Sequence, residues 1–320
     1  MARVGKIHTP HGIIETPSYV PVATNAALKG VDFRQLDADM DAGNDGQQLV
    51  FSNTYHLMLH PGRDIIRDAG GLHKFTRRNA PFITDSGGFQ VFSLAYGSVQ
   101  SERSGGTSNN KNIREDTSEL KRGKTVEKPY WNNDVAEDPV QITEEGVTFT
   151  SYRDNSKMLL TPEITVDAQK DFGADIIIPL DELPPHHISL QTLQESVERS
   201  HRWEARSLKR HLNDVREQAM YAVIHGGLDV NLRKQSVEYL TSLPFDGYAI
   251  GGSLGKDREQ LKKLLTWMMP LFEAEHRKMK PRHLLGIADE ESIRHAVTMG
   301  VDTLDSCYPT KLGRHGTLLS

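Results

Sequence analysis

The stretch that decides the fold runs from Asp175 to His225. Residues 175–181 read DIIIPLD, residues 189–212 carry apolar side chains at helical spacing, and residues 220–225 read MYAVIH. Continuous apolar runs of this length suit strands that are buried on both faces, as in parallel sheets. The stretch therefore predicts a β-strand, a helix and a second strand parallel to the first.

The same alternation extends along the rest of the chain. Further apolar runs cover residues 18–23, 49–54, 81–85, 248–251, 283–287 and 301–305, and further helical spacing covers 162–172, 231–243, 257–275 and 290–299. The first of these helices has a good start, because Thr161 can cap it and Pro162 suits the first helical position. Eight strands alternating with helices predict an α/β fold, a (β/α)8 TIM barrel, with an open doubly wound sheet as the alternative.

The bulk composition fits one large domain that spans residues 1–320. A chain of 320 residues with 37% hydrophobic composition can bury a sizeable core. The net charge of −5 argues against a protein that coats nucleic acid through overall positive charge, but a local cluster of Lys and Arg is enough to hold phosphates. The single cysteine, Cys307, excludes an internal disulfide and a zinc site with several thiolates. The sequence carries no apolar leader and no stretch of membrane-spanning length, so we expect a soluble, cytoplasmic protein.

One segment, residues 98–141, breaks the pattern. It is rich in Ser, Asn, Lys, Glu and Asp and nearly empty of aliphatic residues. It cannot bury enough apolar surface to offset the entropy lost on ordering, so we expect a disordered insertion. A structured lid is the alternative, because active-site loops lie on this side of a barrel.

Polar residues and glycines stand at the carboxyl ends of the predicted strands, where the catalytic groups of such barrels lie. They are Asn53, Asp85, Asp181, His225, Gly251, Gly252 and Asp305. Each of the Asp and Asn residues, taken alone, is explained as the cap of the helix that follows. Three carboxylates at strand ends on the same face indicate a catalytic site instead.

Two of these positions belong to longer motifs. Asp85 opens the motif DSGGFQ, whose paired glycines let the backbone come close to a ligand and whose Phe89 offers a flat face for stacking a base. Asp305 precedes a short basic stretch with Lys311 and Arg314, which would hold phosphates or form a solvated loop. Two carboxylates across a glycosidic carbon, one attacking and one protonating the leaving group, are the usual apparatus for breaking such bonds.

Cysteine and histidine indicate no further site. We expect Cys307 to be a small buried hydrophobe, because no His and Asp partners that would activate its thiol stand out in the sequence. The histidines that could suggest a metal lack a convincing third and fourth ligand, so we interpret them as structural or surface residues. They are His56, His60, His186 and His187.

Five motifs occur in the order of one enzyme family. They are NTYHL at 53–57, DSGGFQ at 85–90, EGVTF at 145–149, GYAIGG at 247–252, and Asp305 followed by Pro309, Thr310, Gly313 and Arg314. In these motifs, and from the first residue to the last apart from the 98–141 insertion, the sequence resembles the tRNA-guanine transglycosylases, or queuine tRNA-ribosyltransferases.

The resemblance implies a ping-pong base exchange in a (β/α)8 barrel. It implies that Asp305 is the nucleophile, which attacks C1′ of guanosine 34 in a tRNA anticodon and forms a covalent intermediate, and that Asp85 is the general acid/base. Asp181 and the Gly252 amide would bind the pyrimidine edge of the base. The remaining roles follow the same match: Phe89 and Leu285 would sandwich the base, and Lys311 and Arg314 would contact the uridines around it.

Three residues depart from the family pattern. His225 stands where bacterial relatives usually have glutamine; imidazole can still donate to a carbonyl, but base recognition becomes pH-sensitive. Lys311 replaces an arginine, which keeps the charge and loses the bidentate fork. Gly255 stands where enzymes for the small base preQ1 carry valine and queuine-using enzymes carry glycine, so we predict that the pocket admits queuine.

The resemblance also implies partners and a metal. The partners are tRNAs with G34 for Asp, Asn, His and Tyr, together with guanine and either queuine or preQ1, and a homodimer away from membranes is the expected assembly. Family members hold one structural Zn²⁺ on a Cys3His site in a C-terminal subdomain. This sequence ends at Ser320, so we expect it to lack that subdomain and the last barrel helix, and to bind no metal or cofactor.

Rival interpretations stay open. A non-catalytic tRNA-binding subunit of such an enzyme would keep the fold, but the intact Asp85 and Asp305 argue against it. A barrel glycosidase that acts on sugars or free nucleosides would need neither Lys311 and Arg314 nor a stacking Phe89. An archaeal-type relative would carry additional RNA-binding domains, which this sequence does not show.

Overall fold

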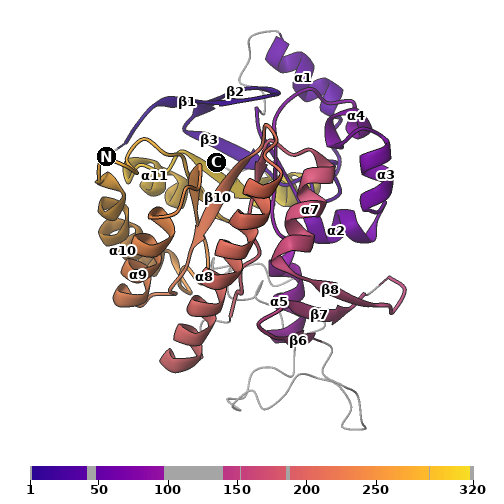
Figure 1. Ribbon diagram of the computed structural model, residues 1–320. Helices are drawn as coiled ribbons and strands as arrows, with labels where there is room; N and C mark the ends of the chain where they lie inside the picture. The colour runs from indigo at the N-terminus through magenta and orange to yellow at the C-terminus, as the bar shows by residue number, and fades with distance from the viewer. Residues whose placement is uncertain are drawn as a thin grey trace.

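Eight parallel strands form the centre of the molecule. The computed structural model describes residues 2–41, 48–96, 140–151, 153–184, 188–287 and 289–317. The strands are hydrogen-bonded in the order β3-β13-β12-β11-β10-β9-β5-β4. They are β3 (Ser18–Pro21), β4 (Val50–Ser52), β5 (Phe82–Thr84), β9 (Ile176–Ile177), β10 (Ala219–Ile224), β11 (Gly247–Ile250), β12 (Arg282–Leu284) and β13 (Thr303–Ser306). A parallel bridge between Val22 and Phe51 joins the two ends of this order, so the sheet closes into the predicted (β/α)8 barrel and not into the open sheet (Figure 1).

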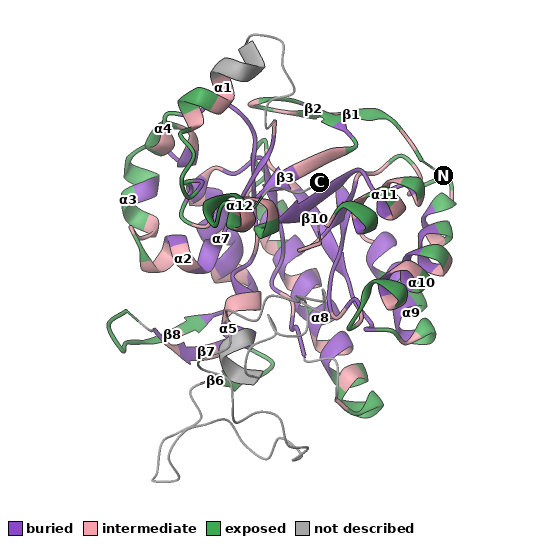
Figure 2. Ribbon diagram, turned by 180° about the vertical axis from the view of Figure 1, so that it is seen from behind, coloured by how far each residue is buried: buried purple, intermediate pink, exposed green. Residues whose placement is uncertain are grey.

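The strands are apolar throughout because both of their faces are buried. Successive side chains of a strand point to opposite faces. Phe51 and Val223 point inward and belong to the cluster that fills the barrel, whereas their neighbours Val50 and Ile224 point outward and pack under the helices. Figure 2 shows buried strands inside a ring of helices whose outer sides are exposed. All eight strands lie where the apolar runs predicted them.

Helices follow the strands and cover the barrel. They are α1 (Phe33–Asp41), α2 (Thr54–Leu59), α3 (Arg63–Asp68), α4 (Leu72–Thr76), α5 (Gly88–Tyr96), α7 (Pro162–Phe172), α8 (Leu190–Asn213), α9 (Val230–Thr241), α10 (Arg258–Met268), η1 (Met269–Glu273), α11 (Glu290–Thr298) and α12 (Tyr308–Arg314). As predicted, Thr161 caps α7: its hydroxyl oxygen accepts from the Ile164 amide at 3.2 Å. The helix predicted at 257–275 divides into α10 and the 3-10 helix η1, because Pro270 has no amide hydrogen to donate. Among the residues that the structure describes, no helix is long and apolar enough to cross a membrane.

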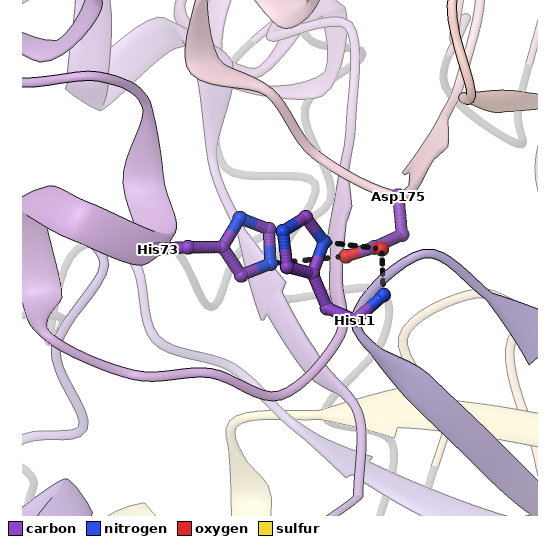
Figure 3. A group of neighbouring side chains, drawn as sticks. All are labelled: His11, His73 and Asp175. Atoms are coloured by element: carbon purple, nitrogen blue, oxygen red, sulfur yellow. Dashed lines mark hydrogen bonds and ion pairs between the residues drawn. The ribbon is translucent and has the colours of Figure 1, made fainter.

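A hairpin closes the end of the barrel at which the strands begin. It consists of β1 (Gly5–Thr9) and β2 (Gly12–Thr16), and its Ile14 is fully buried in the cluster that fills the barrel. At its turn, Nδ1 of His11 lies 2.8 Å from Oδ1 of Asp175, which stands directly before β9. Nε2 of His73, from α4, lies 3.1 Å from Oδ2 of the same carboxylate (Figure 3). Asp175 therefore fastens the hairpin and α4 to the barrel.

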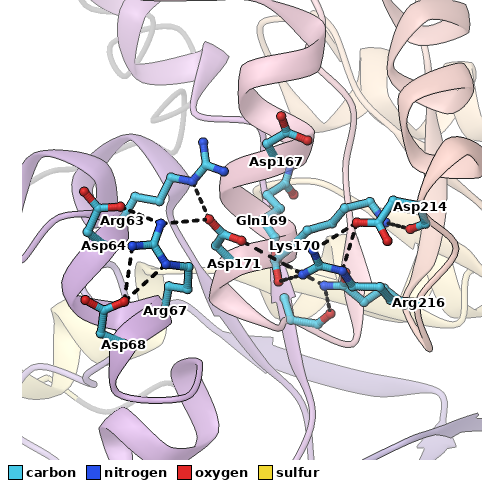
Figure 4. A network of polar contacts seen from close by, with 12 residues as sticks. Arg63, Asp64, Arg67, Asp68, Asp167, Gln169, Lys170, Asp171, Asp214 and Arg216 are labelled. Carbon is cyan, nitrogen blue, oxygen red and sulfur yellow. Dashed lines mark hydrogen bonds and ion pairs between the residues drawn. The ribbon is translucent and has the colours of Figure 1, made fainter.

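Ionic contacts on α7 join further segments to the barrel. Asp171 accepts from Nε of Arg63 at 2.6 Å, and guanidinium nitrogens of Arg67 and Arg216 lie 3.8 and 4.0 Å from the same carboxylate (Figure 4). The neighbouring Lys170 donates to the main-chain carbonyl of Asp214 at 2.5 Å. The arginines of this network are partly exposed, and ion pairs in contact with solvent contribute about 0–1 kcal/mol each, so the network orients α3 and the 214–216 loop more than it stabilises the fold.

A small antiparallel sheet lies beside the other end of the barrel. It consists of β6 (Val140–Ile142), β7 (Val147–Thr150) and β8 (Lys157–Leu160), and Figure 1 shows it on the side opposite the β1–β2 hairpin. Phe149 of β7 packs with Phe92 of α5 and Trp203 of α8 in a separate apolar cluster. This packing holds the family motif EGVTF beside the ends of the strands.

The structure shortens the insertion that was predicted at 98–141. Val140 and Gln141 pair with β7, so the last two residues of that range belong to an ordered strand and not to a disordered segment. The residues with which they pair lie outside the range 98–141, so the composition of that range alone does not indicate the pairing. Residues 97–139, which hold the rest of the predicted insertion, lie outside the described residues.

Candidate active site

The predicted site residues gather where the barrel strands end. Asp85 directly follows β5, His225 directly follows β10, and Asp305 lies near the end of β13. Asp181 and Gly252 follow β9 and β11 after short links. The charges of Asp305 and Asp181 both raise the pKa of Asp85, so the three carboxyls lie close enough to interact. The structure thus brings together the three carboxylates that were expected to share one face.

Asn53 fixes the position of Asp85. The side-chain oxygen of Asn53 caps α2 by accepting from the His56 amide at 3.0 Å, so its amide nitrogen faces the other way and donates to Oδ2 of Asp85. Oδ1 of Asp85 accepts from the amides of Thr54 at 2.8 Å and Gly87 at 3.2 Å. Gly87 has φ +82°, and a Cβ there would lie 2.8 Å from a backbone nitrogen of α2. The loop can therefore approach α2 only with glycine at this position.

Asp85 can hold a proton at neutral pH. Burial raises the pKa of its carboxyl from 3.8 to about 7, and the negative charges of Asp305 and Asp181 act in the same direction. The amides of Thr54 and Gly87 oppose this rise, because they hydrogen-bond to the ionised form. A carboxyl whose pKa lies near the working pH can both give and take a proton, which is what general acid/base catalysis requires.

One oxygen of Asp305 is held, and the other faces no hydrogen-bond donor among the described residues. Oδ1 accepts from the Gly286 amide at 2.9 Å and lies 3.1 Å from Nε2 of His283, a fully buried residue of β12. Nδ1 of His283 lies 2.8 Å from the Thr303 hydroxyl. With Asp305 ionised, Nε2 carries the hydrogen and Nδ1 accepts from Thr303, so the ring is held at both ends. Oδ2 is the oxygen that remains for a substrate.

Sequence reasoning missed His283 and Gly286. From the sequence alone, residues 283–287 are expected to form an apolar strand, and Leu285 alone among them is given a role in the site. The available signal was a polar residue inside an otherwise apolar run, since such a group needs a buried hydrogen-bond partner. That partner comes from the next strand, β13, and local sequence does not identify it.

His225 lies beside Asp181, with Nε2 of the ring 3.6 Å from Oδ2 of the carboxylate. Its backbone amide donates to the hydroxyl of Ser236 in α9 at 3.0 Å. Burial lowers the pKa of the ring well below 6.5, and His201 and Arg233 act in the same direction. The imidazole is therefore neutral at neutral pH, so the predicted pH sensitivity of base recognition does not come from charging this ring near pH 7.

A small pocket lies beside His225, between the first turns of α8 and the loop after β11. Its wall includes Leu193, Gly252 and Ser253. Gly255, farther along this loop, has φ +101°, and a Cβ there would lie 2.6 Å from Cβ of Gln260. The backbone thus requires glycine at 255 whichever base binds, and this glycine alone does not decide the identity of the base.

The other predicted contacts surround this region. Phe89, in the first turn of α5, and Leu285, directly after β12, are both partly exposed, as a stacking contact requires. Lys311 and Arg314 are exposed on α12, the short helix that follows β13. The prediction that Cys307 is buried is wrong: it is a free, exposed cysteine, because it stands in the turn where the chain leaves β13 for α12.

The cluster of His11, His73 and Asp175 has the residue types of a metal site, and its ligand atoms lie within 4.8 Å of one another. The two imidazole rings are stacked, however, with centroids 3.4 Å apart and planes at 13° (Figure 3). A metal ion binds in the plane of an imidazole at about 2.0–2.1 Å, and two nearly parallel planes at this separation cannot both contain it. Asp175 also accepts from the amides of His11 and Phe82 at 3.2 and 2.9 Å, so the cluster is a hydrogen-bonded clasp.

The zinc that the family resemblance implies does not fit the donors of this sequence. A Cys3His site needs three thiolates, whereas the 320 residues contain one cysteine, which is exposed. His56 is half-buried in α2 and burial lowers the pKa of its ring, whereas His60 is exposed at the end of that helix, in agreement with structural and surface roles. His186 and His187 lie outside the described residues.

Comparison with known proteins points to one family. The sequence profile of the family described as Queuine tRNA-ribosyltransferase matches residues 1–127 and 133–320. The chain is similar to the queuine tRNA-ribosyltransferase of Protochlamydia amoebophila, with 54% identity over 320 residues that cover all of this chain and 74% of the relative. It is 49% identical over 322 residues to the same enzyme of Chlamydia felis and 47% identical over 319 residues to that of Chlamydia trachomatis serovar D. Both matches cover all of this chain and 76% of the relative.

Proposed function

This chain belongs to the queuine tRNA-ribosyltransferase family, and we propose that it exchanges guanine 34 of a tRNA anticodon for queuine through a covalent aspartyl–tRNA intermediate. Enzymes of this family are pentosyltransferases that act on tRNA and guanine. The observation that carries the finer proposal is the pair formed by a protonatable Asp85 and an anchored Asp305 at the ends of two barrel strands.

In the first step, Oδ2 of Asp305 attacks C1′ of the nucleoside and the C1′–N9 bond breaks. The bonding electrons leave with guanine, which takes up the proton that Asp85 holds, so the base departs neutral. His283 and Gly286 hold Oδ1 of the nucleophile, which directs the other oxygen toward the sugar. The products are free guanine and a ribosyl ester of Asp305.

In the second step, the incoming base loses a proton to the ionised Asp85 and attacks C1′ from the side that guanine left. The ester bond breaks and Asp305 returns to its carboxylate form. Asp85 ends the cycle protonated, as it began. The pKa of about 7 supports both roles, because a carboxyl of ordinary acidity would rarely hold the proton that the first step consumes.

The groups around this pair match the edge of guanine. Guanine presents a carbonyl acceptor at O6 and donors at N1 and N2, so the Asp181 carboxylate would accept from N1 and N2 while the Gly252 amide donates to O6. His225 lies between these two residues, beside the same pocket. Phe89 and Leu285 would cover the two faces of the ring.

The tRNA itself would be held by α12. Lys311 and Arg314 are exposed on this helix, which begins three residues after the proposed nucleophile. Exposed cations in this position can reach phosphates or bases on either side of nucleotide 34 while the nucleotide lies in the barrel. The overall charge of −5 leaves such local clusters as the source of tRNA affinity.

The choice of queuine over preQ1 needs a direct measurement. The names of the relatives support queuine as the substrate. Gly255 adds no support, because its positive φ and the nearby Gln260 already account for a glycine at this position. Steady-state kinetics with each base and the same tRNA would give the two values of kcat/KM. We expect the larger value for queuine, and an equal or larger value for preQ1 would refute this part of the proposal.

The exchange reaction is tested with labelled guanine and a tRNA that carries G34 in a U-G-U context. We expect label to enter the tRNA with the unaltered chain, together with a protein–tRNA adduct that survives denaturation. Asp305→Asn should abolish both signals. Asp64→Asn, at an exposed position of α3, is the matched control and should retain both.

The rival functions give different results in the same assay. A non-catalytic tRNA-binding subunit would bind the tRNA without incorporating label. A glycosidase would release base from free nucleosides and would not need tRNA. Folded protein that gives either result would refute the proposal.

A further inference from the structure

Glu204 is a buried acid that no sequence motif signals. It lies in the middle of α8, is fully buried, and faces the end of β10. Its Oε2 accepts from the Val223 amide at 2.9 Å, and its Oε1 lies 3.2 Å from Nε2 of His225. In the described part of the chain, neither Oε1 nor Nε2 has an aligned hydrogen bond to any group. Oε1 of Glu204 lies closer to Nε2 than does Oδ2 of Asp181, which is 3.6 Å away.

The ring of His225 reaches from this acid to the base pocket. Its Nε2 faces Glu204, and its Nδ1 faces Gly252, where an added Cβ would lie 3.6 Å away. His225 and Gly252 both line the pocket. A neutral imidazole carries one hydrogen on one of its two nitrogens. Whether Nε2 carries this hydrogen therefore decides whether Nδ1 is a hydrogen-bond donor or an acceptor toward a base.

The surroundings of the pair favour two neutral partners over an ion pair. Burial raises the pKa of Glu204 well above its usual range, and the charge of Asp181 raises it further. Burial lowers the pKa of His225, and His201 and Arg233 lower it further. A protonated acid beside a neutral imidazole donates its hydrogen to Nε2, which leaves the ring hydrogen on Nδ1.

We propose that Glu204 is a positioning residue for base recognition: its carboxyl hydrogen-bonds to Nε2 of His225 and so places the ring hydrogen on Nδ1, where it serves as a donor to O6 of the base. An ionised Glu204 would have the opposite effect, because it would accept from Nε2 and present a bare Nδ1 to the carbonyl. The proposal rests on the proposed function for its substrate. The state of the ring itself is independent of activity.

The ring hydrogen can be located without any substrate. Two-dimensional ¹H–¹⁵N spectra of histidine-labelled protein at neutral pH separate the two tautomers, and the signal of His225 is the one lost in His225→Gln. We expect the hydrogen on Nδ1. A hydrogen on Nε2 would overturn the proposal, even if the enzyme exchanges guanine as proposed above. If exchange is absent and the hydrogen is on Nδ1, the proposed function fails and the assignment of the ring stands.

Two substitutions of Glu204 separate positioning from packing. In Glu204→Gln the amide oxygen must accept from Val223, so the NH₂ group faces His225 and donates to Nε2 as the acid does. We expect its KM for guanine to stay within about twofold of the original, whereas Glu204→Met, of similar size and without a donor, should raise that KM about tenfold. Equal KM increases in the two variants would refute positioning.

The same substitutions in a His225→Gln background complete the test. A glutamine at 225 has an NH₂ donor that does not depend on the residue at position 204. Glu204→Met should therefore change the KM for guanine less than about twofold in the His225→Gln background. A tenfold effect that persisted in this background would show that Glu204 acts only through packing. Thermal unfolding of all variants controls for folding, because Glu204→Met also leaves the Val223 amide without its acceptor.

Discussion

Asp85→Asn removes one partly buried, titrating carboxyl, and its effect on stability should depend on pH in a defined way. The pKa of this carboxyl is raised from 3.8 to about 7 in the folded protein. Between these two values the folded state holds a proton that the unfolded chain has lost. The free energy of unfolding of the unaltered protein therefore falls as the pH rises through this window and levels off above about 7. Asparagine does not titrate, so the variant lacks this contribution.

The size of the effect follows from the two pKa values. The difference between about 7 and 3.8 is about three units, and at about 1.36 kcal/mol per unit the full contribution is about 4 kcal/mol. This is an upper bound, because the carboxyl retains some contact with solvent. Between about pH 5 and about pH 8 the difference in free energy of unfolding between the two proteins should change by about 2.5 kcal/mol in favour of the variant.

The pH dependence separates the loss of the titrating carboxyl from a second effect of the substitution, a hydrogen-bond mismatch that does not depend on pH. Asn53 presents an amide donor to Oδ2 of Asp85, so the new amide opposes either that donor or the two backbone donors on Oδ1. Such a mismatch costs about 1–3 kcal/mol at every pH. Asp85→Asn is therefore less stable than the original in acid and approaches or exceeds it in base.

Urea unfolding at a series of pH values measures both effects. The difference in free energy of unfolding between the variant and the original is plotted against pH, with Asp64→Asn, at an exposed position, as the control substitution of the same type. A flat line for Asp85→Asn would show that Asp85 titrates alike in the folded and unfolded states. Asp85 would then hold no proton for catalysis at neutral pH.

Three further predictions concern other parts of the molecule. His283→Phe should lower kcat about tenfold and leave the KM for tRNA within about twofold, because the ring holds the proposed nucleophile and not the substrate; an unchanged kcat would count against that role. Asp175→Asn should lower the free energy of unfolding by about 3 kcal/mol in urea at neutral pH. Burial works to raise the pKa of Asp175, but its hydrogen bonds lower the pKa overall. The stability that the ionised Asp175 contributes is therefore lost as the pH falls through the pKa of the folded state. The free energies of unfolding of Asp175→Asn and of the original protein should accordingly converge in acid. Replacing both Lys311 and Arg314 by alanine should reduce the slope of log affinity for tRNA against log salt by about 2 in filter binding, while a loss that is independent of salt would contradict phosphate contacts.

The barrel could be predicted from the sequence because its strands are buried on both faces. Runs such as residues 220–224 are apolar at every position, and that pattern needs no knowledge of distant residues. The β6–β8 sheet was missed for the opposite reason. Phe149 and its neighbours are held by Phe92 and Trp203, which come from distant parts of the chain, so no local periodicity reports their burial.

The candidate site divides in the same way. Asp85 and Asp305 could be found because they follow apolar strands, at the positions where barrel enzymes keep catalytic groups. Glu204 could not be found, because it is one of several acids in a long helix and only the packing of α8 against β10 distinguishes it from its exposed neighbours. The burial of Cys307 was predicted wrongly because it follows the last residue of β13. A shift of one residue in the end of a strand decides whether the next side chain points inward or outward.

The acidic side chains at this end of the barrel must be partly protonated for the proposed chemistry to work. Asp85, Asp181, Glu204 and Asp305 would together repel both the tRNA backbone and the negative charge that develops on departing guanine. Burial keeps the proton on Glu204 and leaves Asp85 close to half-protonated near pH 7.

The first step uses the protonated form of Asp85, so kcat/KM for tRNA should fall above about pH 7, approaching a tenfold loss per pH unit. The second step uses the ionised form, so kcat/KM for the incoming base should instead rise with pH and level off, at a lower pH than the first profile because the esterified Asp305 no longer carries the charge that raises the pKa of Asp85. Initial rates at a series of pH values, with each substrate limiting in turn, distinguish the two profiles. If both fell together above pH 7, the proton would belong to a group needed in both steps, and Asp85 would not be the acid and base of this exchange.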